Sequence, residues 1–125
     1  MTYEIYFGIP EIRDFWLELN EKVDKNDANK DEIRFLKILK KTISLLQENP
    51  HHNSLNSHEI KILSRRYGMK VWESYLENNK PAAGRLFWIY YPSGSITIIG
   101  LEQHPDDNKH SYEKITLSST NEEEK

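Results

Sequence analysis

Residues 71–102 contain three short runs that read as successive β-strands, and this pattern most limits what the chain can fold into. The runs are rich in β-branched and aromatic residues, which favour strands, and successive side chains of a strand point to opposite faces. Turn residues separate the runs, with ENNKPAAG after the first and Pro92-Ser93-Gly94 after the second. The sequence therefore predicts a three-stranded antiparallel meander with strands near 71–76, 85–91 and 96–101.

The N-terminal half predicts a strand followed by two helices. YEIYF at 3–7 is rich in strand-forming residues, and Pro10 suits the first turn of a helix. Apolar residues then recur at helical spacing along 12–23 and along about 32–48, where Asn49-Pro50 stops the pattern. The short polar segment 24–31 joins the two as an antiparallel hairpin, with Asp31 as the expected N-cap of the second helix.

Residues 58–67, HEIKILSRRY, fit either a strand or a short helix, and the pattern does not decide between them.

These elements predict one α+β domain over 1–119, an antiparallel sheet packed on a helical hairpin, with a disordered acidic tail at 120–125. No stretch reaches the ~20 apolar residues of a membrane span, and the first residues do not resemble a signal peptide. The absence of cysteine excludes disulfides and thiolate metal sites. We expect a cytoplasmic protein without a membrane partner.

The net charge of −3 is unevenly distributed along the chain. Residues 102–125 hold seven acids and three bases, a net of −4, so residues 1–101 carry thirteen acids and fourteen bases, a net of +1. Four cations gather in the middle of the chain: Lys61, Arg65, Arg66 and Lys70. They could hold an RNA backbone or form an ordinary solvated face, so a polyanionic partner is permitted but not required.

Charged and titratable side chains lie at the ends of the predicted strands. Arg85 opens the middle strand and could fork onto two phosphate oxygens, or form a salt bridge with Glu102 or Glu77. His104 follows the last strand and could transfer a proton, or be an exposed loop histidine. Glu73 lies inside the first strand and could act as a general base, or be paired with Lys70 or Arg66.

The hairpin register decides whether these groups meet. If Tyr91 lies opposite Ile96, then Arg85 lies opposite Glu102, with His104 just beyond on the same side. A slip of one residue would destroy the arrangement.

Other residues carry weaker signals. Tyr112 could stack on a base or donate its hydroxyl to a leaving group, or belong to the core. His51, His52 and His58 match no zinc signature, so no metal or small-molecule cofactor is expected. Trp16, Trp72 and Trp88 are predicted core residues.

The order strand, helix, helix and antiparallel sheet resembles the RelE/ParE toxin superfamily, and most closely its RelE-like mRNA interferases. The matching segments are LLQENP at the end of the second helix, GRLFWIYY with its arginine, ITIIGLEQH ending at a histidine, and Tyr112 downstream. They are short, and the similarity covers roughly residues 3–117.

The resemblance implies the toxin of a toxin–antitoxin pair, cutting mRNA on the ribosome without a metal through the ribose 2′-hydroxyl. Arg85 would contact the scissile phosphate, His104 would be the general acid, and Tyr112 and Glu73 would assist. A small antitoxin protein would block the site. Asp106 and Asp107 stand where several members carry cations, which favours the alternative of a non-catalytic relative that binds a protein target, gyrase or another.

Overall fold

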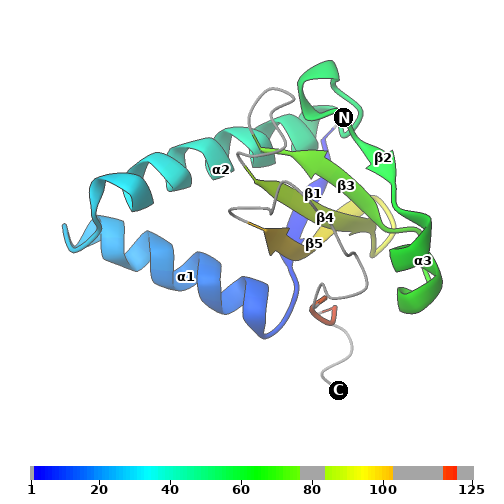
Figure 1. The fold of residues 1–125 in the computed structure, drawn as a ribbon, viewed down its shortest axis with the longest axis horizontal. Coiled ribbons are helices and arrows are strands. Elements are labelled where there is room, and N and C mark those ends of the chain that lie inside the picture. Colours follow the sequence, from blue (N-terminus) through cyan, green and yellow to red (C-terminus); the bar gives the residue numbers. More distant parts are fainter. Residues whose placement is uncertain (1, 77–83, 103–116, 121–125) are drawn as a thin grey trace.

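The computed structural model describes residues 2–76, 84–102 and 117–120, and these form an α+β fold, as predicted (Figure 1). In chain order the elements of these residues are β1 (Glu4–Phe7), α1 (Glu11–Asp24), α2 (Lys30–Glu48), the 3-10 turn η1 (Asn53–Leu55), β2 (His58–Glu59), α3 (Lys61–Tyr67), β3 (Trp72–Tyr75), β4 (Arg85–Tyr90) and β5 (Ser95–Glu102). None of the helices in this part of the chain combines the length and apolar character that a membrane crossing requires.

The strands form one sheet in the order β1-β5-β4-β3-β2. β3, β4 and β5 are antiparallel neighbours, which confirms the predicted meander. β1 lies at one edge and pairs in parallel with β5, with Glu4 opposite Ser95 and Phe7 opposite Ile98. Strands that pair in parallel need a long connection, and here all three helices and β2–β4 lie between them along the chain.

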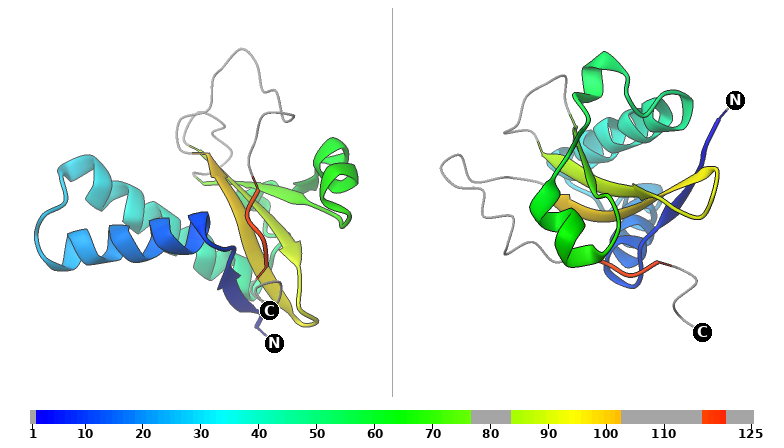
Figure 2. Two further views of the ribbon diagram at one scale, coloured as in Figure 1. Left: turned by 90° about the horizontal axis from the view of Figure 1, so that it is seen from below. Right: turned by 90° about the vertical axis from the view of Figure 1, so that its right-hand side faces the viewer.

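Helical layers cover both faces of the sheet (Figure 2). Leu86 and Trp88 of β4 face the hairpin of α1 and α2, where they pack in one cluster with Leu46. Phe87 of the same strand points the other way and packs in a second cluster with Leu63 of α3. Successive side chains of β4 therefore enter two different apolar layers, and both layers are withdrawn from water.

Helix α2 starts at Lys30 because Asn29 caps it, so the prediction of Asp31 as the N-cap is wrong. The Asn29 side chain accepts a bond from the Glu32 backbone N–H at 2.8 Å, and the Glu32 carboxylate accepts one from the Asn29 backbone N–H at 3.0 Å. This reciprocal arrangement is a capping box. The helix ends at Glu48, before Asn49 and Pro50, as predicted.

Residues 58–67 hold both of the elements that the sequence pattern allowed. β2 pairs with β3 in antiparallel register, with His58 opposite Glu73, and α3 follows from Lys61. A strand of two residues is too short to show an alternating pattern, which is why the sequence left this region open. Gly68 ends α3 in the left-handed region at φ 85°, where glycine is favoured.

The hairpin of β4 and β5 has the predicted pairing at one end only. Tyr90, and not Tyr91, lies opposite Ile96, so the expected start of the register is wrong by one residue. At the other end Arg85 lies opposite Glu102, as predicted.

A β-bulge explains why the register differs by one residue between the two ends of this hairpin. Trp88 pairs with Ile98 while the preceding Phe87 pairs with Gly100, so Ile99 is the extra residue of β5. Gly100 fits beside it because a Cβ there would come within 3.2 Å of the Phe87 Cβ. Glycine in a strand often marks such a bulge, and without the extra residue Arg85 and Glu102 would not face each other.

The segment 117–120 lies across the α3 side of β5. The Ser118 backbone N–H donates to the Ile99 carbonyl at 2.7 Å, and Ser119 forms a bridge with Ile9. Thr120 is buried, although the sequence assigned it to the acidic tail. Residues 121–125 of that predicted tail lie outside the described residues.

Candidate functional site

Two of the residues predicted to carry chemistry, Glu73 and Arg85, meet in the sheet. Both lie on the face that α3 covers. Residues two apart in a strand share a face, and Glu73 is two residues from Val71 and Arg85 two from Phe87, both in the cluster on that side. Arg85 Nη1 lies 2.6 Å from Glu73 Oε2. Because Tyr75 is the residue directly opposite Arg85, this contact runs diagonally between β3 and β4.

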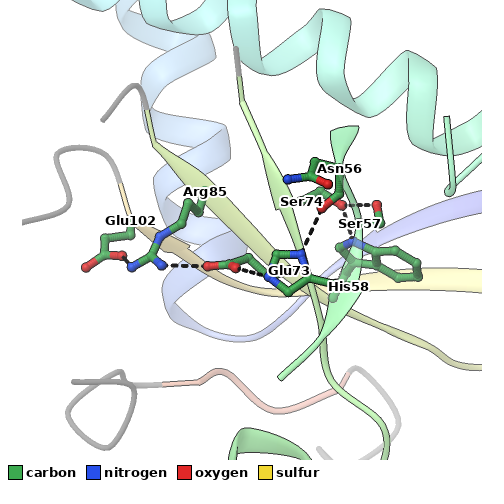
Figure 3. Close-up of polar contacts among 8 residues, drawn as sticks. Asn56, Ser57, His58, Glu73, Ser74, Arg85 and Glu102 are labelled. Atoms are coloured by element: carbon green, nitrogen blue, oxygen red, sulfur yellow. Dashed lines mark hydrogen bonds and ion pairs between the residues drawn. The ribbon is translucent and has the colours of Figure 1, made fainter. Parts of the chain in front are cut away.

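The pair extends on both sides into a row of four charged side chains (Figure 3). On β5, Glu102 Oε1 contacts Arg85 Nη2. On β2, His58 Nε2 lies 2.8 Å from Glu73 Oε1. We call His58, Glu73, Arg85 and Glu102 the charged row, which runs across four neighbouring strands from β2 to β5.

Burial differs sharply along the charged row. The side chains of Glu73 and Arg85 are 1% and 3% exposed, whereas those of His58 and Glu102 are 43% and 32% exposed. An ion inside a protein is costly unless it is paired and hydrogen-bonded. Here Arg85 lies between two carboxylates, and Glu73 contacts both Arg85 and the His58 ring, while only the two ends of the row reach solvent.

His58 ends the row on β2. Its Nδ1 lies 2.9 Å from the Asn56 carbonyl oxygen, and its Nε2 faces the Glu73 carboxylate. Both ring nitrogens of His58 therefore face hydrogen-bond acceptors.

Arg85 and Glu73 are less accessible than their predicted roles require. The alternative prediction of a salt bridge between Arg85 and Glu102 is confirmed, and Glu73 takes the other terminal nitrogen of Arg85. The guanidinium is therefore closed to an outside phosphate in this arrangement. Both Glu73 oxygens accept bonds within the charged row, so neither is open as a general base. His104 and Tyr112 lie outside the described residues, and their roles stay predictions.

From the sequence, His58 was considered only as a metal ligand, and its contact with Glu73 was not predicted. Its partner Glu73 was expected to pair with Lys70 or Arg66, and neither Arg85 nor His58 was named for it. His58 lies three residues before the start of α3, and reading 58–59 as a strand paired with β3 would have placed it opposite Glu73. A strand of two residues is too short to be recognised from its sequence pattern.

The four cations predicted to bind RNA lie on the surface, in the stretch of chain that follows His58. Lys61, Arg65 and Arg66 are exposed on α3, and Lys70 is exposed in the loop after it. Helix α3 begins three residues after His58, so the exposed end of the charged row and these cations come from one continuous stretch of chain. The RNA-binding role of the cations stays a prediction.

Of the three tryptophans predicted to be core residues, Trp88 is buried in the core, and Trp16 and Trp72 are half-buried and pack against it. Trp88 is fully buried and stacks on Trp72 at 5.8 Å between ring centroids, and Trp16 stacks on Phe7 at 4.7 Å. His51 stands edge-on to Trp72, and its Nε2 lies 3.1 Å from the Tyr90 hydroxyl.

Burial raises the pKa of the Tyr90 phenol, which therefore stays protonated at neutral pH. Among the described residues, histidine and acidic side chains do not gather in a group of three or more that could hold a metal ion.

Comparisons of the chain with models of protein families, with curated proteins and with solved structures give no match. The resemblance to the RelE/ParE superfamily therefore stays a prediction from the sequence.

Proposed function

We propose that this chain is the toxin of a toxin–antitoxin pair and that it cuts RNA without a metal, with His58 as the proton donor. The observation that carries the proposal is an exposed imidazole held against a buried carboxylate, which a buried guanidinium holds in turn. A carboxylate behind a histidine orients the ring and stabilises its cationic form. Histidine is also the side chain best suited to proton transfer near neutral pH.

The reaction requires one proton at a defined place. The ribose 2′-oxygen attacks the adjacent phosphorus, the bond from phosphorus to the 5′-oxygen breaks, and the departing 5′-oxygen needs a proton. His58 Nδ1 would give it, with the leaving oxygen replacing the exposed Asn56 carbonyl as the partner of Nδ1. Glu73 would keep hold of Nε2 throughout, and the proton of the 2′-hydroxyl would pass to water.

The surface around His58 suits a polyanionic substrate. Lys61, Arg65, Arg66 and Lys70 would contact the RNA backbone, since phosphate contacts position a nucleic acid without selecting its sequence. Arg85 would act as a positioning residue that fixes Glu73, and it would not touch the phosphate in the arrangement described here.

The test is induced expression in bacteria, combined with mapping of cut sites in ribosome-bound mRNA. We expect His58→Ala to reduce the cleavage rate by about 10²–10⁴-fold, the usual contribution of a positioned general acid. His51→Ala is the matched control, because His51 is also an exposed histidine with a side-chain partner but lies on the other face of the sheet.

His104→Ala tests the donor that the resemblance implies. If His58→Ala cuts mRNA at the wild-type rate, or if only His104→Ala abolishes cleavage, the assignment of His58 is wrong.

A second candidate function is binding of a protein target without RNA cleavage. It is favoured by the closure of the charged row, in which both terminal nitrogens of Arg85 and both oxygens of Glu73 are used internally. Growth arrest with intact mRNA in the same experiment would support this candidate, whereas ribosome-dependent cleavage would exclude it.

A further inference from the structure

Helix α2 carries a second concentration of positive charge that the proposed cleavage site does not use. Arg34, Lys37, Lys40 and Lys41 are all exposed, and no acidic residue occurs between Ile33 and Gln47. We call these four residues the α2 basic face. The sequence from Ile33 to Gln47 thus holds four basic residues and no acidic one, in a chain whose net charge is −3.

Two other lysines of the same helical hairpin are paired with carboxylates. Lys22 Nζ lies 2.6 Å from Glu32, and Lys25 Nζ lies 2.8 Å from Glu21. Within residues 2–76, 84–102 and 117–120, by contrast, no carboxylate lies within ion-pair distance of Lys37, Lys40 or Lys41. These three lysines therefore differ from Lys22 and Lys25 in having no carboxylate partner there.

The spacing of the α2 basic face is unfavourable for the helix itself. Lys37 has like charges three residues before it at Arg34, and three and four residues after it at Lys40 and Lys41. Like charges four residues apart, as in Lys37 and Lys41, destabilise an isolated helix by about 0.2–0.5 kcal/mol. Placing like charges side by side on a helix lowers its stability. Where nothing in the structure compensates for that loss, we expect the charges to serve a function.

We propose that the α2 basic face binds the phosphate backbone of RNA as a second contact surface, a role that rests on the proposed RNA function. The helical hairpin and α3 lie on opposite sides of the sheet, so this surface is separate from the cations beside His58 (Figure 2). The RNA held there is a different stretch of backbone from the one that is cut.

The composition of the surface favours a nucleic acid over a protein partner. Protein interfaces are enriched in aromatic residues and depleted in lysine, whereas contacts to phosphate use lysine and arginine. From Arg34 to Lys41 the helix rises by about 10 Å, which exceeds the spacing of successive phosphates along one strand. Lysines placed in this way act as point charges and carry no sequence preference.

Salt-dependent binding tests this surface independently of cleavage. The probe is a fluorescein-labelled 2′-O-methyl RNA oligonucleotide, which cannot be cut through its 2′-oxygen, titrated with the full chain over a series of potassium chloride concentrations. We expect the combined variant Lys37→Gln, Lys40→Gln, Lys41→Gln to bind more weakly and to reduce the slope of log K against log salt by about 2, since each lost phosphate contact contributes about 0.7 for a single strand.

The matched control is Lys22→Gln with Lys25→Gln, which also removes lysine charge from the hairpin but at residues with carboxylate partners. We expect this control to keep a slope closer to wild type than the triple variant does. Glutamine has nearly the same helix propensity as lysine, so both variants should fold.

Three outcomes overturn the inference: no RNA binding by the wild type, an unchanged slope in the triple variant, or an equal loss in the control. Unchanged RNA binding with loss of growth arrest would assign the face to a protein partner instead. If the wild type binds RNA through the α2 basic face but does not cut it, the proposed nuclease function is wrong. The inference that this face binds RNA is then still supported.

Discussion

Removing one member of the Glu73–Arg85 pair leaves the other inside the sheet without its buried partner of opposite charge. In Arg85→Met, the Glu73 carboxylate keeps His58 but loses its buried partner, while its side chain stays 1% exposed. Breaking a buried pair in this way typically costs about 3–5 kcal/mol. We therefore expect Arg85→Met to lower the free energy of unfolding by that amount, measured by urea denaturation.

Removing both charges together should cost much less. In Arg85→Met with Glu73→Leu, the charges that remain are His58 and Glu102, and both reach solvent. Replacing a buried pair by apolar residues is often close to neutral, so most of the loss should be recovered. If the double variant loses as much as the two single variants combined, the two charges are not coupled as the geometry indicates.

Only one of the three contacts in the charged row could be predicted from the sequence. Arg85 and Glu102 were paired correctly because they are opposite residues of one hairpin. The contact of Glu73 with Arg85 is diagonal, and that of His58 with Glu73 depends on a two-residue strand. Neither of these two contacts follows from the periodicity of the sequence, so both were found only from the structure.

At the scale of the elements, the N-terminus of α2 is held by contacts that can be removed one at a time. Asn29→Ala removes the acceptor for the Glu32 backbone N–H. Loss of an N-cap side chain typically costs about 0.5–2 kcal/mol. We expect a loss within this range in urea denaturation, whereas Asp31→Ala should have a smaller effect because Asp31 is not the cap.

Glu32 should make the stability of the hairpin depend on pH. The hydrogen bond from Lys22 holds the pKa of the Glu32 carboxyl below its ordinary value, and the Asn29 backbone N–H adds to this effect. A lowered pKa in the folded state stabilises the fold above the ordinary pKa, and this contribution is lost as the pH falls through the lowered value.

Glu32→Gln should therefore be less stable than wild type near neutral pH, and the difference should shrink in acid. Urea denaturation of both proteins across a pH series measures this difference. A difference that stays constant down to the lowest pH would show that the charge of Glu32 contributes nothing. Added salt should weaken the same difference, because the pair is exposed.

The elements that the sequence predicts best are those with long periodic patterns. Both helices of the hairpin and the three strands of the meander extend over enough residues for their periods to be recognised. The bulge at Ile99 left no such signal, since Ile98 and Ile99 are equally apolar and occupy opposite faces. The Arg85–Glu102 pairing was correct because the one-residue error at Tyr91 is cancelled by that bulge.

For the molecule as a whole, the sheet order determines which parts are hardest to unfold. β4 and β5 lie inside the sheet, with a strand on either side and an apolar cluster on each face. Helix α1 contributes one buried residue, Leu19, and leaves Leu17 exposed. Regions with few buried contacts open more readily than the core of the same domain.

Native-state hydrogen exchange should therefore rank the elements. We expect the slowest amides in β4 and β5, exchanging only through global unfolding, and faster exchange along α1 through local opening. Arg85→Met should speed exchange in β4 and β5 by the same free energy that it removes in urea denaturation, because the charged row lies within this central unit. Amides of α1 that exchange as slowly as those of β4 would show that the hairpin and the sheet unfold as one cooperative unit and would contradict this ranking.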